Sequence, residues 1–144
     1  MPDLTLTRHF TAPPEKVFAF ISRTEHLLTW WGPEGMSVPE HDLGFARTGP
    51  WFSVMTNAEG QRFKVSGHVT HVDPPNSIGF TWAWHDEADR RGVESHVTIR
   101  LVPARNGGTD FSLHHADLPD ADTAANHESG WTSSLRKLER IANH

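Results

Sequence analysis

The most constraining feature of the sequence is a long stretch, residues 36–115, in which apolar and polar side chains alternate with period two. Turn-forming residues such as Asn106-Gly107-Gly108 interrupt the alternation, and short connections of this kind predict antiparallel strands. Each predicted strand has one apolar face, so the sheet needs a cover on one side only. The clearest predicted strands are Phe63–Val72, Ile78–Trp84, His96–Val102 and Thr109–His115.

The last segment, residues 122–142, supplies that cover. Its apolar side chains recur at spacings of three and four, which predicts one long helix with a single apolar stripe. Gly130 lies in mid-helix, where Gly costs about 1 kcal/mol relative to Ala. Two interpretations of this glycine are open: a point of close approach between helix and sheet, which we favour, and a neutral change at an exposed site. The stripe consists of Ala124, His127, Trp131, Leu135, Leu138 and Ile141.

The N-terminal segment adds one strand and two short helices. Residues 3–10 alternate as a strand should, and Pro13-Pro14 suits the first turn of a helix. Ser22-Arg23-Thr24-Glu25 fits a capping box that opens a second helix from His26 to Trp30 or Trp31. The predicted fold is α+β and of helix-grip type: a curved antiparallel sheet of about six or seven strands around a long C-terminal helix. We expect residues 1–144 to form a single domain.

Composition excludes several partners. The net charge is -5 and the basic residues are scattered, which argues against nucleic-acid binding. No apolar run approaches membrane-spanning length, and the N-terminus lacks the pattern of a signal peptide, so we expect a cytoplasmic protein without a membrane span. The absence of cysteine excludes disulfides and thiolate chemistry.

The aromatic residues point to a cavity. The chain holds six Trp, eight Phe and no Tyr. One helix is about 10 Å across and cannot fill the concave side of a wide sheet. We therefore expect an apolar cavity with a few polar groups, which describes a small-molecule site. The candidate lining residues are Trp30, Phe63, Val65, Trp82, Trp84, His115, His127, Glu128, Trp131 and Leu135.

Two adjacent tryptophans, Trp30 and Trp31, directly precede Gly32-Pro33. Neighbouring side chains on a helix lie about 100° apart, so the two rings cannot enter the same part of the core. We expect Trp31 to be the packing anchor and Trp30 to lie nearer the cavity mouth.

Among eleven histidines, His115 and His127 are the candidates for a role in the cavity. His115 shares the inward face of its strand, and His127 lies on the helical stripe one turn before Trp131. We expect both to converge with Glu128, either as a buried polar network that holds the helix to the sheet or as a ligand anchor or acid/base pair. His85, in an acidic loop, is expected to be solvated. The three-ligand patterns of metal sites and the motifs of nucleophilic enzymes are absent, so we assign no metal, cofactor or catalytic residue.

Several motifs, taken in order, resemble a known family. The chain is similar to the SRPBCC superfamily, also called START-like or helix-grip, and within it to the bacterial homologues of the heat-shock-protein-90 ATPase activator. The family often has two adjacent glycines where this chain has Gly49-Pro50. The motifs are Pro14-Glu15-Lys16-Val17-Phe18, Trp30-Trp31-Gly32-Pro33-Glu34-Gly35, Val65-Ser66-Gly67 with Asp73-Pro74-Pro75, Phe80-Thr81-Trp82, and His127-Glu128-Ser129-Gly130-Trp131 running on to Leu135 and Leu138.

The resemblance implies a domain that accommodates a ligand, since superfamily members bind lipids, sterols and polyketides, and some catalyse cyclisation or hydrolysis. The eukaryotic co-chaperones pair this domain with a second one, for which 144 residues leave no room, so ATPase activation is not expected. Our leading hypothesis is a non-enzymatic domain that binds a small apolar or aromatic molecule. The alternatives are a cyclase- or hydrolase-type enzyme that uses a pocket histidine, and a co-chaperone-like interaction module. Monomer and homodimer both stay open.

Overall fold

The computed structural model describes residues 3–142, which form one sheet and three helices. The strands are β1 (Leu4–Phe10), β2 (Ser37–His41), β3 (Gly49–Thr56), β4 (Arg62–Asp73), β5 (Ser77–Trp84), β6 (Ser95–Pro103) and β7 (Thr109–Ala116). The helices are α1 (Pro14–Ser22), α2 (Thr24–Trp30) and α3 (Ala121–Ala142).

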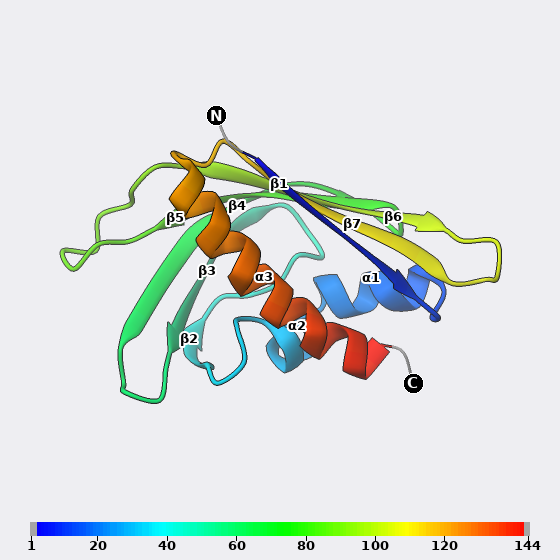
Figure 1. Cartoon of the computed structure of the whole chain (residues 1–144), viewed down its shortest axis with the longest axis horizontal. Helices are drawn as coiled ribbons and strands as arrows, with labels where there is room; N and C mark the ends of the chain where they lie inside the picture. The colour runs from blue at the N-terminus through cyan, green and yellow to red at the C-terminus, as the bar shows by residue number, and fades with distance from the viewer. Residues whose placement is uncertain (1–2, 143–144) are drawn as a thin grey trace.

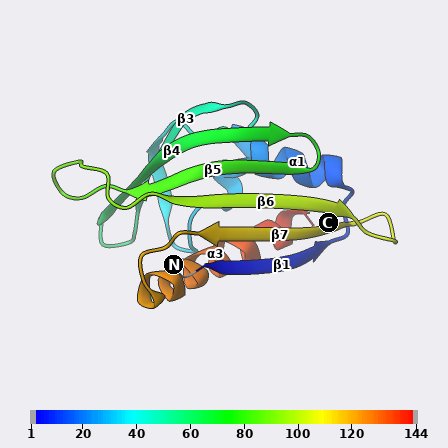
Figure 2. The same cartoon turned by 90° about the horizontal axis from the view of Figure 1, so that it is seen from above.

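The described strands form a seven-stranded antiparallel sheet in the order β1-β7-β6-β5-β4-β3-β2. From β2 to β7 each strand pairs with the next one in sequence, as expected for strands joined by short turns. β1 forms one edge of the sheet and pairs with β7, where Leu6 lies opposite Leu113. Figure 1 shows the sheet arching over the helices, and Figure 2 shows the strands side by side with α3 beneath them.

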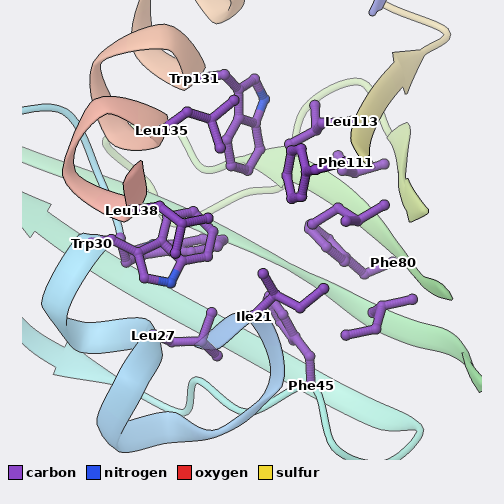
Figure 3. Close-up of a cluster of buried hydrophobic side chains, with 14 of the residues drawn as sticks. Ile21, Leu27, Trp30, Phe45, Phe80, Phe111, Leu113, Trp131, Leu135 and Leu138 are labelled. Atoms are coloured by element: carbon purple, nitrogen blue, oxygen red, sulfur yellow. The ribbon is translucent and has the colours of Figure 1, made fainter. Parts of the chain in front are cut away.

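α3 lies against the concave face and buries the central part of the predicted stripe. Leu135 and Leu138 are completely buried, and Trp131 is 5% exposed. Figure 3 shows these α3 side chains and Trp30 of α2 pointing into the space in front of the sheet, where Phe80 also projects. Burying a Leu side chain contributes about 1.5–3 kcal/mol to folding stability. Burial of the stripe therefore holds α3 against the sheet. The predicted helix-grip fold of the α+β class is confirmed.

The corner between α1 and α2 forms differently from the prediction. α2 begins at Thr24, and its N-cap residue Arg23 makes no side-chain capping hydrogen bond. The Ser22 hydroxyl instead donates to the Phe18 carbonyl at 2.6 Å, inside α1. The predicted capping box is therefore wrong, because the Ser22 side chain bonds backward along its own helix instead of forward to the next one.

Truncation of the stripe tests the packing of α3. We expect Leu138→Ala to lower the free energy of unfolding by about 2–5 kcal/mol, because it removes buried methyl groups and leaves a cavity. Urea denaturation measures the change. Arg136→Ala, at an exposed position of the same helix, is the matched control and should change stability by less than about 0.5 kcal/mol. Equal effects of the two substitutions would contradict this packing.

Candidate functional site: an aromatic cavity under the C-terminal helix

A cavity of about 310 Å³ lies between the N-terminal half of α3, the sheet and the loop that follows α2. Apolar cavities of about 150 Å³ hold benzene, so this one has room for a molecule about twice that size. Most of the wall is aromatic or aliphatic, and no Asp, Glu, Lys or Arg is among the described residues that line it. The lining consists of Trp31, Gly32, Pro33, Met55, Trp82, Trp84, Thr123, Asn126, His127, Gly130, Trp131 and Ser134.

The ring of Trp82 is central to the wall. Its centroid lies 5.2 Å from that of Trp131 on α3, 5.5 Å from that of Trp84 and 5.9 Å from that of Trp31. Tilted and edge-to-face pairs at these distances are favourable beyond their area burial. The rings therefore fix one another, and the wall is formed before any ligand arrives.

Trp31, and not Trp30, lines the cavity. Trp30 is completely buried, and its indole N–H donates to the Phe20 carbonyl at 2.9 Å. The expectation that Trp30 lies nearer the mouth is therefore wrong. α2 ends at Trp30, and Trp31 already has extended backbone angles (φ -64°, ψ 134°), so its side chain leaves the direction that the helix would have given it.

His115 lies behind the wall, completely buried, in a chain of hydrogen bonds. Its Nδ1 accepts from the indole N–H of Trp131 at 3.1 Å. An indole can only donate, so Nδ1 carries no proton and Nε2 carries it in the neutral ring. Nε2 lies 2.7 Å from the Ser95 hydroxyl, which donates to the Trp82 carbonyl at 3.2 Å. The network joins α3 to β5, β6 and β7, and both ring nitrogens are satisfied.

His127 reaches the cavity, and its tautomer is fixed as well. Nε2 accepts from the indole N–H of Trp84 at 2.9 Å, across two elements that lie 43 residues apart in sequence. Nδ1 lies 2.7 Å from the Thr123 carbonyl, an acceptor, so Nδ1 carries the proton. The rings of His115 and His127 lie edge to face, with centroids 5.0 Å apart. Both histidines are thus held neutral by donor-only indoles.

The pKa shifts of His115 and His127 agree with two neutral rings. Burial lowers the pKa of His115 from 6.5 to about 3, with the neighbouring His127 as the next cause. Burial also lowers the pKa of His127, and the hydrogen bond to Thr123 opposes that shift. Protonation would place an N–H against an indole N–H in each case, so the site stays uncharged near neutral pH.

The structure places the other predicted site residues outside the cavity wall. Val65 and Leu135 are completely buried in the core. Glu128 is exposed, because it lies about 100° around α3 from His127. Phe63 is 36% exposed. β5 ends at Trp84, opposite Val65, so Phe63 on β4 has no partner in β5.

Residues that sequence reasoning missed complete the wall, among them Met55, Asn126 and Ser134. They lie on β3 and α3, and period alone does not distinguish them from ordinary core or surface positions. Gly130 could be singled out from the sequence, because glycine in mid-helix lowers helix stability. A Cβ added there would meet only Pro33 Cγ at 3.8 Å, an ordinary contact, so close approach to the sheet does not require this glycine. It adds space to the cavity.

A second polar cluster lies elsewhere, around His85, whose side chain is 10% exposed. The prediction that His85 is solvated is wrong: its Nε2 lies 2.6 Å from the Ser66 hydroxyl and its Nδ1 2.9 Å from Asp89 Oδ1. The guanidinium of Arg91 donates to both the hydroxyl and the carbonyl of Ser66. The hydroxyl thus has two hydrogen-bond partners within the protein. We assign this cluster to anchoring the loop between β5 and β6 on β4.

Among residues 3–142 there is no group of three or more His, Asp or Glu side chains placed to hold a metal ion. Over the same residues, no helix is long and apolar enough to cross a membrane.

Comparison with known proteins identifies the family. Residues 11–143 match the family described as Activator of Hsp90 ATPase homolog 1-like protein. The chain belongs to this family. None of the curated proteins compared with it matches.

Solved structures of similar proteins share the fold. The AHSA1 protein of Silicibacter pomeroyi is 56% identical, with a TM-score of 0.93 over 97% of this chain and 96% of that one. A Chromobacterium violaceum protein is 27% identical, with a TM-score of 0.87 over 100% of this chain and 99% of that one. A Rhodobacter sphaeroides protein is 25% identical, with a TM-score of 0.81 over 96% and 90% of the two chains. The predicted kinship with the bacterial activator homologues is confirmed.

The neutral state of His115 makes stability depend on pH. The folded-state pKa lies below the ordinary value of 6.5, so the unfolded chain binds more protons as the pH falls from 6.5 toward about 3. The stabilisation is complete only above about pH 7.5, and about 2 kcal/mol of it should be lost between pH 7.5 and pH 5. Urea denaturation at both pH values measures the loss.

In His115→Gln, which does not titrate in this range, the loss should be smaller by that amount. His68→Gln, at an exposed position, should leave it unchanged. An NMR titration in which the His115 ring protonates near pH 6.5 would contradict the buried network.

Proposed function

We propose that this protein is a non-enzymatic, cytoplasmic domain that binds a compact, uncharged aromatic molecule in the cavity under α3. The observation that carries the proposal is the cavity itself, about 310 Å³ of space walled by Trp31, Trp82, Trp84 and Trp131. Preformed apolar pockets with a few placed polar groups are the usual form of small-molecule sites. Flat rings suit these walls because indoles offer stacking and edge contacts.

The charge of the wall narrows the ligand class. No ionised side chain is among the described lining residues, and the one histidine in the wall is held neutral. A charged ligand group would lose its hydration without gaining a partner, which is costly. We therefore favour neutral ligands of about two fused rings.

The enzymatic alternative has less support. A general base needs a free lone pair within reach of the substrate. Nδ1 of His115 accepts an indole hydrogen bond behind the wall, and burial lowers the pKa of both His115 and His127, which makes each ring a weaker base. The interaction-module alternative needs a contiguous exposed apolar patch. The large exposed apolar side chains of the described residues come from separate elements: Leu28, Phe63, Val93 and Val102.

Two substitutions at Gly130 form a matched test of the cavity. Gly130→Ala should stabilise α3 by up to about 1 kcal/mol and leave most of the space open. Gly130→Phe should place a ring in the cavity and abolish binding. Thermal-shift screening of the wild type with a panel of lipids, sterols and polyphenols, followed by calorimetry of each hit on both variants, measures the effect. Absence of any hit on the wild type, or equal binding to both variants, would contradict the proposal.

A further inference from the structure

A second, smaller chamber of about 170 Å³ adjoins the aromatic cavity. Its own walls are mainly apolar and include Val93, Leu118 and Pro119. The two chambers have Trp82, Trp84, Thr123 and His127 in common. The hydrogen bond from Trp84 to His127 joins two of these shared residues, so it lies in the partition between the chambers.

The chemistry of that hydrogen bond is asymmetric. Trp84 Nε1 can only donate. His127 Nε2 can only accept, because Nδ1 carries the proton toward the Thr123 carbonyl. At present the two groups satisfy each other at 2.9 Å. A ligand that enters the partition must separate them, and each would then be left without a partner unless the ligand replaces both bonds.

We propose that the Trp84–His127 pair is the recognition site for a ligand hydroxyl group. A hydroxyl oxygen inserted between them accepts from Trp84 Nε1 and donates to His127 Nε2, so one bond is exchanged for two. The ligand's ring system then lies in the larger chamber, and a small apolar substituent beside the hydroxyl enters the smaller one. This inference rests on the proposed function and specifies its ligand class as compact aromatic alcohols or phenols.

Other ligand groups satisfy only part of this arrangement. A ketone or ether oxygen accepts from Trp84 and leaves His127 Nε2 unpaired. An aliphatic amine is charged at neutral pH, and burying it in an uncharged wall is costly. An alkyl group can replace neither bond, so the hydrocarbon leaves the pair closed and gains no hydrogen bond from it. The alcohol is therefore predicted to bind more tightly than both the ketone and the hydrocarbon.

Three ligands of nearly equal shape test the proposal: 1-(2-naphthyl)ethanol, 2-acetylnaphthalene and 2-isopropylnaphthalene. We expect the alcohol to bind the wild type about tenfold more tightly than the hydrocarbon, the ratio that corresponds to about one net hydrogen bond. Isothermal calorimetry gives the three dissociation constants. The hydrocarbon acts as an internal control in every variant, because it uses the cavity but not the polar pair.

Two variants locate the effect. Trp84→Phe removes the donor and keeps an aromatic ring, and His127→Phe removes the acceptor. Each should reduce the preference for the alcohol to about twofold or less, while His68→Phe, on an exposed site, should keep it. An independent readout on the wild type is the indole N–H resonance of Trp84, assigned by its absence in Trp84→Phe. It should shift on binding the alcohol and stay nearly unchanged with the hydrocarbon.

The outcomes separate this inference from the function beneath it. Equal affinity of the three ligands, or a preference for the alcohol that persists in both variants, would overturn the role of the pair and leave the binding function standing. Failure of all three to bind the folded wild type would overturn both. A shift of the Trp84 resonance with the alcohol, together with loss of the preference in the variants, is the supporting result.

Discussion

The packing of Trp31 is the interaction on which the rest of this structure depends. Its ring lies within about 6 Å of five other rings, which come from different parts of the chain: Trp30 of α2, Phe45, Trp51 of β3, Trp82 of β5 and Trp131 of α3. Its indole N–H donates to the buried hydroxyl of Ser53 at 2.9 Å, so the ring has one orientation. Because one helix cannot fill the concave side of a wide sheet, these rings fill part of it and leave the remainder as a cavity.

The polar groups of the site follow from the same crowding of indoles. A buried indole N–H is stabilised by an acceptor, and a neutral histidine provides one for two of the three indoles that α3 and β5 contribute to the cavity wall, while Trp82 Nε1 has no partner among the described residues. Trp131 uses His115 and Trp84 uses His127 in this way. The two hypotheses for these histidines, a structural network and a ligand anchor, therefore apply to different residues. His115 is structural, since it is completely buried and both nitrogens are bonded within the core. His127 lies in the wall of both chambers, where a ligand can compete for its bond.

The spacing of apolar residues along the sequence predicted the strands and helices well, because an element that buries one face repeats apolar residues at a regular period. The inward positions of Trp82 and Trp84 on β5, and of Trp131 on α3, were readable from alternation and helical spacing. Phe63 has the same parity as Val65 and yet is exposed, since parity gives the face of a strand and not how far the neighbouring strand extends. Trp31 is the packing anchor, as expected, but it also lines the cavity in place of Trp30. The difference arises because α2 ends between the two residues, and helix boundaries are hard to predict from sequence.

The sequence by itself determined the fold: one apolar face per strand, one apolar helical stripe and short turns leave few arrangements other than a sheet wrapped around its last helix. It also determined that the interior would be rich in rings without hydroxyls. Only the tertiary structure decided which rings meet, how much space they leave, and which histidine nitrogen carries the proton. Those properties depend on contacts between residues far apart in sequence, such as Trp84 and His127, and no local pattern encodes the distance between two such side chains.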